Sequence, residues 1–347
     1  MIDTRKLQEY LEDRFGHVRV VECKRLGAGV HGTGFSLIIE TTKGIQRYVI
    51  KDLAPEGLGH DYPSDRASVF LLAYDEYGKL PKHVKPFDVI ALMDDGSIKS
   101  MGGGKEYFLI MEMADGTNYF VDLEAMKEKD HLDEKDREKI ILMVEYLSHI
   151  HAVKKESRTL YWRKIRDTIG HGECLMGVFD SYPDGHVSYE EMAEIEKMAV
   201  DWRPVLKRLS HRLCQIHGDF HPGNIWFKDG DFVLLDRSRG PWGDGADDVT
   251  ALTINYIFYS IMYHDKVTGA YEEALNLFYD EYISRTDDRE LLKVVAPFYA
   301  FRAAVVAHPV FYPQLRPEQR QMVLNLAKNI LRAEEFRPNQ VNEYITG

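Results

Sequence analysis

The sequence has few cysteines and no long apolar segment, and both shortages restrict what the protein can be. Its longest apolar candidate, Ala251 to Tyr263, is interrupted by Thr, Asn, Tyr and Ser and falls short of the roughly 18 apolar residues that a membrane helix needs. Three scattered cysteines form neither a disulfide framework nor a metal cluster. The N-terminal residues also lack the apolar core of a secretory signal. We therefore expect a soluble protein of the reducing cytoplasm, with no membrane partner.

The sequence also lacks the positive charge that a nucleic-acid-binding protein needs. It has 44 Lys and Arg against 56 Asp and Glu, a formal net charge of -12. Non-specific binding to nucleic acid requires a cationic surface that displaces counterions, so we expect no nucleic-acid partner. The 347 residues exceed what one compact core usually organises, which predicts two lobes.

The most informative segment is His217-Gly-Asp-Phe-His-Pro-Gly-Asn224, with Asp236 following the apolar run Phe232-Val-Leu-Leu235. Phosphoryl transfer from a metal nucleotide needs this combination of groups. One carboxylate, Asp219, orients and deprotonates an attacking hydroxyl, while the amide of Asn224 and the carboxylate of Asp236 hold metal ions. The spacing therefore indicates a kinase.

A glycine-rich segment near the N-terminus supports this interpretation. Gly27, Gly29 and Gly32 follow one strand-like run and are followed by two more, residues 34–40 and Ile45-Gln-Arg-Tyr-Val-Ile-Lys51, which a turn at 41–44 joins. A dinucleotide-binding fingerprint would need a helix to begin at the last glycine, whereas a Gly-rich β-hairpin over nucleotide phosphates is typical of kinases. Lys51 ends the third strand, where a kinase places its phosphate-binding lysine. The alternatives are a plain tight turn and a solvated lysine.

The next segments predict the rest of an N-terminal lobe. Residues 64–80 carry Val69, Leu72, Ala73, Glu76 and Leu80 on one helical face, so Glu76 is a candidate ion-pair partner of Lys51, the alternative being a surface carboxylate. The apolar run Tyr107 to Met113, which leads into Ala114-Asp-Gly116, predicts a last strand and an interlobe hinge that reads adenine through backbone groups. We expect a nucleotide-binding lobe over residues 1–116.

Residues 117–347 predict a mostly helical lobe that carries the catalytic loop and the acceptor site. An amphipathic helix over Leu132 to Lys155 includes His149 and His151, which cannot share a helix face and therefore do not form a metal pair. Residues 156–215 form an insertion before the catalytic segment, either an acceptor-binding element or a surface helical hairpin. Tyr256, Tyr259 and the run Phe298 to Phe301 either line the acceptor site or belong to the core.

These motifs resemble the aminoglycoside phosphotransferase and choline kinase superfamily of protein-kinase-like small-molecule kinases. The resemblance covers roughly residues 20 to 260 in ordered motifs, including a downstream Gly243-Asp244 and Asp248. It implies that Asp219 is the catalytic base, that Asn224 and Asp236 bind Mg²⁺, and that Lys51 binds phosphate. It also implies that adenine meets backbone groups at Glu112 and Ala114, and that His217 and Asp248 support the catalytic loop.

Two points compete with or depart from this resemblance. His217 and His221 are alternative metal ligands, but a His pair suits zinc, whereas Asp and Asn suit Mg²⁺. Asp236 is followed by Arg237, where an apolar or aromatic residue is more usual in the family, and by Ser238, where some relatives have glycine. Arg237 and Arg239 either favour an anionic acceptor or ATP phosphate, or form salt bridges to the acidic segment Asp244 to Asp248, and we expect the salt bridges.

The sequence thus predicts an α+β, two-lobed, protein-kinase-like fold. The predicted reaction is ATP- and Mg²⁺-dependent transfer of the γ-phosphoryl group to a hydroxyl of a small molecule that is aminoglycoside-, sugar- or amino-alcohol-like. The alternatives are a non-catalytic nucleotide-binding regulatory protein and a protein kinase. The joint presence of Lys51, Asp219, Asn224 and Asp236 argues against the first. The signature at His217 to Asn224 argues against the second.

Overall fold

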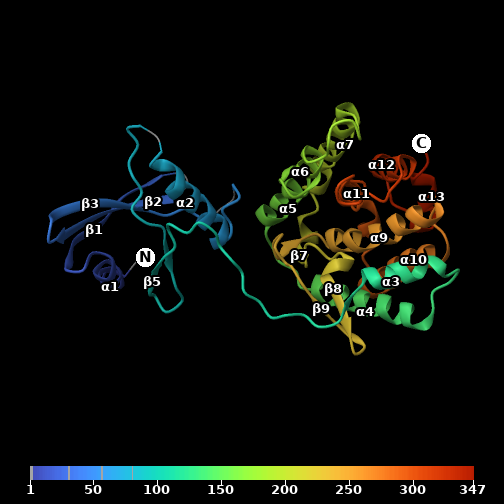
Figure 1. The fold of residues 1–347 in the computed structure, drawn as a ribbon, viewed down its shortest axis with the longest axis horizontal. Coiled ribbons are helices and arrows are strands. Elements are labelled where there is room, and N and C mark those ends of the chain that lie inside the picture. Colours follow the sequence, from blue (N-terminus) through green and yellow to red (C-terminus); the bar gives the residue numbers. More distant parts are fainter. Residues whose placement is uncertain (1–2, 30–31, 56–57, 80) are drawn as a thin grey trace. The chain divides into compact units, whose positions relative to one another are not determined.

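The computed structural model describes residues 3–29, 32–55, 58–79 and 81–347. The chain divides into two compact units, Met1–Met111 and Glu112–Gly347 (Figure 1). We call them unit 1 and unit 2 and describe each by itself. This division lies five residues before the boundary expected from the sequence, because unit 1 ends at residue 111 rather than 116.

Unit 1 is built on an antiparallel sheet of three consecutive strands in the order β1-β2-β3. The strands are β1 (Val18–Gly29), β2 (Gly32–Thr41) and β3 (Gly44–Lys51), which begin and end close to the predicted runs. Helix α1 (Thr4–Phe15), capped by the Asp3 side chain, packs against β1. Alternate strand residues point to the same face, so Leu37 and Ile39 of β2 join Leu7 and Leu11 of α1 in a small apolar core.

The remaining elements of unit 1 are short. Helix α2 (Pro63–Tyr77) covers most of the predicted range 64–80, and β4 (Ile90–Leu92) pairs with β5 (Ile98–Ser100). The apolar face predicted for α2 is not buried, since Val69 and Leu72 are exposed. Leu80, assigned to the same face, lies outside the described residues.

The strand predicted over the last residues of unit 1 and the first residues of unit 2 is wrong. The run Tyr107 to Met113 has no regular secondary structure, and Phe108, Leu109 and Ile110 are each more than four-fifths exposed. A strand requires a neighbouring strand that accepts its backbone hydrogen bonds, and this segment has none among the described residues. Apolar composition alone therefore gave the wrong prediction for this run.

Unit 2 is mostly helical. A long amphipathic helix, α4, forms as predicted and is capped by the reciprocal hydrogen bonds of Asp133 and Asp136. The helices are α3 (Phe120–Ala125), α4 (Glu134–His151), α5 (Arg158–Gly170), α6 (Leu175–Asp180), α7 (Tyr189–Asp201), α8 (Arg203–Leu206), α9 (Gly245–His264), α10 (Gly269–Thr286), α11 (Ala296–Val306), α12 (Pro317–Arg332) and α13 (Val341–Tyr344).

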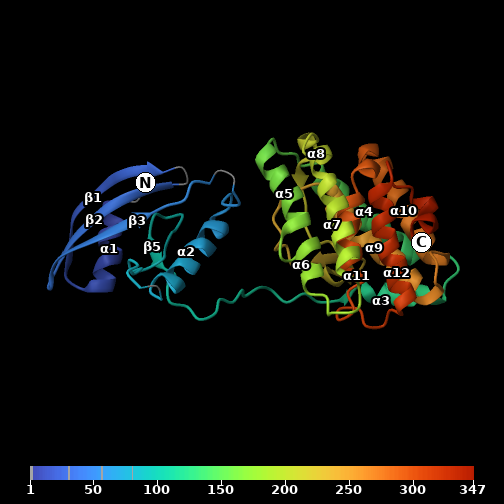
Figure 2. The same ribbon diagram turned by 90° about the horizontal axis from the view of Figure 1, so that it is seen from above.

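The helices of unit 2 surround one large apolar core. Helix α9 is buried along most of its length, and α11 packs against α9 and α12 as well as against α5, α6 and α7. Both views place α5, α6 and α7 on one side of unit 2 and α10 on the other (Figures 1 and 2). The predicted insertion, residues 156–215, is therefore packed onto the central helix α11.

Two small sheets frame the segment that contains the predicted catalytic motif. Strand β7 (Cys214–Gln215) pairs with β10 (Trp242–Gly243), and β6 (Thr117–Asn118), β8 (Ile225–Lys228) and β9 (Asp231–Leu234) form a second antiparallel sheet. The loop after β7 leads to β8 and the loop after β9 leads to β10, so each loop connects the two small sheets. The structure confirms the predicted α+β architecture of an N-terminal antiparallel sheet and a mostly helical C-terminal part. In the part of the chain that the structure describes, no helix is long and apolar enough to span a membrane.

Candidate active site

The loop that carries Asp219 is held at its start by a buried carboxylate. Asp248, on the first turns of α9, accepts the backbone N–H of His217 at Oδ2 and that of Gly218 at Oδ1, both at 2.7 Å. The Nε2 atom of His151 lies 3.1 Å from the same carboxylate. Burial raises the pKa of Asp248, but hydrogen bonds from His151 and His217 outweigh burial and lower it overall. Asp248 therefore stays ionised and fixes the backbone just before Asp219.

Asp219 is buried and has two arginines on one of its oxygens. Arg302 Nη1 lies 2.6 Å from Oδ1, and Arg239 Nη1 lies 3.3 Å from the same atom. The other oxygen, Oδ2, is 4.0 Å from Nε2 of His221. Burial raises the pKa of Asp219, but the positive charges of Arg302 and Arg239 prevail and lower it to about 2. Asp219 is therefore an ionised carboxylate whose Oδ1 is occupied and whose Oδ2 accepts no strong hydrogen bond from the described residues.

Asn224 ends a short 3-10 helix, Pro222–Asn224, directly after Asp219. It is buried, and its amide nitrogen donates to the backbone oxygen of Asp219 at 3.0 Å. Gly223 allows this tight turn, because a Cβ at this position would lie 2.7 Å from the ring of His221 and 2.9 Å from that of Phe120. The amide oxygen of Asn224 is the atom able to coordinate an ion, and the hydrogen bond of the nitrogen fixes the way the amide faces.

Asp236 lies just beyond β9 and is exposed, with a left-handed φ of 51°. The backbone N–H of Leu235 donates to the carbonyl of Asn224 at 2.9 Å, so the loop of Asp219 and the segment of Asp236 are joined beside each other. Within the described residues, no three His, Cys, Asp or Glu side chains are grouped to hold a metal ion. One amide and one carboxylate oxygen suit Mg²⁺, which binds few protein oxygens and completes its shell with water and phosphate.

In unit 1 the predicted phosphate-binding residues lie on one sheet. Gly27 of β1 pairs with Gly34 of β2, and Gly34 pairs in turn with Lys51 of β3. Gly29 pairs with Gly32 at the described end of the hairpin, and its tip at residues 30–31 lies outside the described residues. A Cβ at Gly32 would lie 2.1 Å from the backbone oxygen of Asp52. The sheet thus brings Lys51 and the three predicted glycines to neighbouring strand ends.

Other residues predicted for nucleotide binding differ from expectation or lie in irregular structure. Glu76 pairs with Lys79 at 2.6 Å, and no ion pair joins it to Lys51, although both residues are described. The helix places Lys79 three residues after Glu76, within easy reach. Glu112 is exposed and Ala114 half-buried, in the irregular segment where unit 2 begins.

The arginines after Asp236 do not form the expected pairs with the acidic segment 244–248. Arg237 donates to the backbone oxygen of Ile216, and Arg239 contacts Asp219 and Glu173. The acidic segment is neutralised from elsewhere. Arg212 pairs with Asp244, while Lys164 and Arg302 pair with Asp247. These partners come from the insertion and from α11, which sequence spacing could not indicate.

Most of the aromatic residues proposed for the acceptor site belong to the core. Tyr256, Phe298 and Phe301 are almost fully buried, and the Tyr256 hydroxyl lies 3.1 Å from that of Tyr119. Tyr259 is half-buried and lies near Phe120, which in turn lies near His221, with ring centroids 6.4 Å and 6.0 Å apart. Of this group, Tyr259 alone remains beside the loop of Asp219 with part of its surface free.

Arg302 was missed by sequence reasoning, although it touches the central carboxylate. A signal does exist, since Arg302 is the single charged residue in the apolar helix Ala296–Val306. A charge inside a buried helix must find a partner. Its partner is 83 positions away along the chain, so the sequence does not reveal which acid it is.

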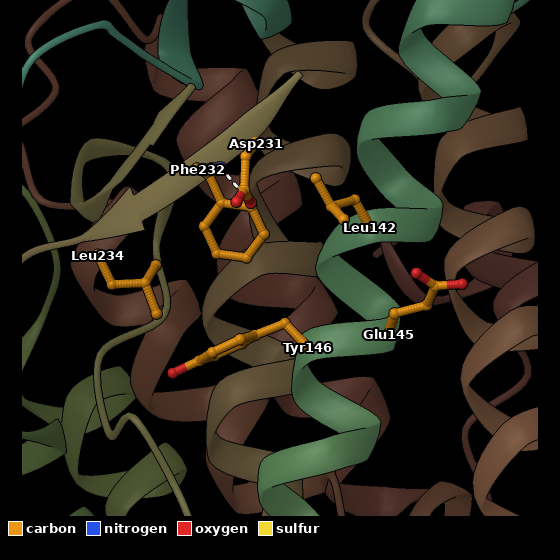
Figure 3. A pocket seen from close by; sticks show the side chains of 6 residues that line it. All are labelled: Leu142, Glu145, Tyr146, Asp231, Phe232 and Leu234. Atoms are coloured by element: carbon orange, nitrogen blue, oxygen red, sulfur yellow. Dashed lines mark hydrogen bonds between the residues drawn. The ribbon is translucent and has the colours of Figure 1, made fainter. Parts of the chain in front are cut away.

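A pocket of about 310 Å³ lies elsewhere, between α4 and β9. Figure 3 shows Leu142 and Tyr146 of α4 facing Phe232 and Leu234 of β9. None of its lining residues is a predicted site residue. The pocket is lined in part by β9, the strand that leads to Asp236, and it presents mainly apolar side chains rather than the groups that phosphoryl transfer needs.

Comparison with known families identifies the kind of protein that carries this site. The family model described as the phosphotransferase enzyme family matches residues 24–276, almost three quarters of the chain. The chain belongs to the phosphotransferase enzyme family. The match includes the Gly-rich hairpin, Lys51 and the loop of Asp219, whereas Arg302 lies beyond the matched part of this phosphotransferase.

Several solved kinase structures are similar to this phosphotransferase at low identity. The amicoumacin kinase hAmiN in complex with AMP-PNP, Ca²⁺ and Ami is 14% identical, with a TM-score of 0.43 and 96% of each chain covered. The aminoglycoside phosphotransferase APH(4)-Ia is 14% identical, with a TM-score of 0.37, covering 95% of this chain and 99% of its own. A Plasmodium vivax ethanolamine kinase is 14% identical, with a TM-score of 0.35, covering 97% and 84%. A search of curated proteins finds no match to the sequence.

Proposed function

We propose that this phosphotransferase is a cytoplasmic small-molecule kinase that transfers the γ-phosphoryl group of ATP, with Mg²⁺, to a hydroxyl group. The observation that carries the proposal is the state of Asp219. It is a buried and ionised carboxylate with one oxygen held by arginines and the other available. Phosphoryl transfer needs such a group beside the attacking hydroxyl.

In this proposal Oδ2 of Asp219 accepts the hydrogen bond of the acceptor hydroxyl and orients its oxygen toward the phosphorus atom. The pKa of Asp219, about 2, makes it a weak base. This suits a loose transition state in which the hydroxyl gives up its proton late, as the bond to phosphorus forms. Asp219 would then act mainly through orientation and receive the proton at the end of the transfer.

The metal and the nucleotide would be held by other residues of the chain. The Asn224 amide oxygen and the Asp236 carboxylate would hold Mg²⁺, which neutralises charge on the phosphates. Lys51 and backbone groups of the hairpin at Gly27, Gly29 and Gly32 would contact phosphate oxygens. The backbone at Glu112 and Ala114 would meet adenine. The acceptor would be a hydroxyl-rich molecule of the aminoglycoside, sugar or amino-alcohol kind.

A non-catalytic regulatory protein is the second candidate, and a protein kinase the third. The arrangement around Asp219 favours catalysis, because nucleotide binding alone gives no reason to bury a carboxylate between two arginines. Burying charges is costly unless each is paired.

A screen of Mg-ATP consumption over hydroxylated metabolites and aminoglycosides tests the proposal. With an acceptor in hand, Asp219→Asn should keep the circular dichroism spectrum and AMP-PNP affinity of the wild type but lower turnover by at least ~10²-fold. Asp201→Asn, at the exposed end of α7, serves as the control. Equal turnover by the Asp219→Asn variant and the wild type would remove Asp219 from its proposed role.

A further inference from the structure

Asp219 is the first member of a continuous series of buried charges that crosses unit 2. Arg302 joins Asp219 to Asp247, with contacts of 2.6 Å and 2.9 Å through its two terminal nitrogens. Lys164 then contacts the other oxygen of Asp247 at 2.5 Å. All four residues are buried, with relative exposures between 1% and 8%. We call Asp219, Arg302, Asp247 and Lys164 the ion-pair network.

The members of the ion-pair network come from four separate parts of unit 2. Asp219 lies on the loop after β7, Arg302 on α11, Asp247 on α9, and Lys164 on α5 of the insertion. Helix α11 packs against both α5 and α9, so the ion-pair network joins these three helices. Each charge is held by an element whose position is already fixed by the core.

The contacts of Arg302 restrain Asp219 in more than one way. Arg302 Nη1 binds Oδ1 of Asp219, while Nη2 contacts both Asp247 and the backbone oxygen of Gly218, the latter at 3.3 Å. A guanidinium is planar and rigid, so its three contacts fix the Asp219 carboxylate relative to its own backbone. Arg239 touches the same oxygen at 3.3 Å and is more exposed, which makes Arg302 the stronger restraint.

We propose that Arg302 is a positioning residue for the transfer reaction, held in place by Asp247 and Lys164, which orients Asp219 so that Oδ2 faces the acceptor hydroxyl. The inference rests on the proposed function of Asp219. Arg302 binds Oδ1 and thereby leaves a single oxygen for the acceptor. Since a misplacement of about 1 Å can lower turnover about 10²-fold, this orientation has a direct effect on rate.

A purely stabilising role explains the ion-pair network less well than a positioning role does. A buried ion pair is often no more stabilising than apolar residues of the same volume. The Nε atom of Arg302 is also buried without a hydrogen-bond partner among the described residues, which adds a desolvation cost. A leucine or methionine at this position of the apolar helix α11 would avoid both costs. The arginine is explained by what it does to Asp219.

Arg212 provides a matched control, because it is a second buried arginine of unit 2 that bridges acidic side chains. It pairs with Asp244, Asp288 and Glu290 and has the same 5% exposure as Arg302. No hydrogen bond or ion pair joins Arg212 to Asp219, although both residues are described. Replacing Arg212 therefore causes comparable damage to the core without altering the restraint on Asp219.

The experiment compares three single variants, Arg302→Met, Arg302→Lys and Arg212→Met, and one double variant of the full-length protein. The double variant carries both Lys164→Met and Asp247→Asn, and we call it the charge-neutral pair. The substrate is Mg-ATP with water as the acceptor, so that the slow hydrolysis can be measured before the natural acceptor is identified. Folding is checked by circular dichroism and thermal unfolding. AMP-PNP affinity is measured by calorimetry.

We expect Arg302→Met to lower kcat about 10²-fold with KM for ATP changed less than about threefold. Arg302→Lys keeps the charge but loses the planar fork, so it should recover part of the rate and remain about tenfold below the wild type. The charge-neutral pair should also be about tenfold slower, because Arg302 then has a weaker second anchor. Arg212→Met should unfold at lower temperature yet keep the wild-type kcat per folded molecule.

Several results would overturn the inference. One is an Arg302→Met variant that binds AMP-PNP normally and keeps the wild-type kcat. Another is a loss of kcat in Arg212→Met as large as that in Arg302→Met. If Arg302→Met does not fold, the decision rests on Arg302→Lys and the charge-neutral pair. Wild-type kcat in both of these would end the proposal. If the wild type does not turn over ATP, either with water or with any acceptor tested, the kinase proposal itself is overturned, and the positioning role with it.

Discussion

Asp248 holds Gly218 across thirty positions of the chain, through a hydrogen bond of 2.7 Å from the Gly218 N–H to Oδ1. The same carboxylate accepts the N–H of His217. A carboxylate that accepts two buried N–H groups sets the course of the backbone directly before Asp219. The start of α9 and the loop of Asp219 therefore behave as one structural unit.

Asp248→Asn should destabilise unit 2 and slow catalysis. The amide can accept one N–H but presents its own NH₂ group to the other, so a buried donor is left unsatisfied. We expect a loss of about 2 to 4 kcal/mol in the free energy of unfolding and lower turnover per folded molecule. Denaturant unfolding measures the first effect, with Asp280→Asn on the exposed face of α10 as the control. Equal stability of the two variants would contradict this account of the loop.

Asp236→Ala should remove most of the Mg²⁺ dependence of nucleotide binding, because a carboxylate is one of the few protein ligands that the ion would have. AMP-PNP is titrated with and without Mg²⁺, and we expect the enhancement by Mg²⁺ to fall about tenfold. Asp229→Ala is a close control, since both residues are exposed and have nearly equal left-handed φ angles of 52° and 51°. An unchanged enhancement in the Asp236 variant would show that the metal is held elsewhere.

Lys51→Met should weaken nucleotide binding in both the presence and the absence of Mg²⁺. The lysine would contact phosphate oxygens directly, and loss of a charge-assisted contact costs about tenfold in affinity. Lys43→Met, at the exposed turn between β2 and β3, is the control for charge on the same hairpin. If Lys51→Met bound AMP-PNP as the wild type does, Lys51 would be a solvated strand-end lysine.

Asp244 should make the stability of unit 2 sensitive to acid. Burial raises the pKa of its carboxyl, but Arg212 and the Tyr161 hydroxyl more than compensate, so the pKa is lowered in the folded state. Its contribution is therefore complete above the unfolded pKa of about 4 and is lost as the pH falls toward the folded value. The free energy of unfolding of the wild type and of Asp244→Asn, measured with denaturant between about pH 6 and about pH 3, tests this. A wild-type curve as flat as that of the variant would contradict the linkage.

Sequence reasoning succeeds where a signal is local. Strands β1 to β3 and helix α4 show their own periodicity, and the candidate residues Asp219 and Asn224 lie five positions apart in one motif. It fails for Tyr107 to Met113, because an apolar run becomes a strand only when a neighbouring strand is available. Strand pairing is a tertiary property that the run itself does not contain.

The same limit applies to the candidate site. The motif includes Asp219 but not Arg302, whose contact with it depends on how α11 packs against α9. The expected pairing of Arg237 and Arg239 with residues 244–248 relied on closeness in sequence. In the structure the partners of that segment are Arg212, Lys164 and Arg302, because burial selects partners by position in space.

The contact between Lys164 and Asp247 has a consequence for engineering this phosphotransferase. Residues 156–215 are the predicted acceptor-binding insertion, and exchanging them with those of a relative would test that prediction. Such a chimera would remove Lys164 and leave Asp247 with Arg302 as its only charged partner among the described residues. A successful graft should therefore carry a matching lysine in its first helix or replace Asp247 in the host, so that changes in specificity are not obscured by a poorly held Asp219.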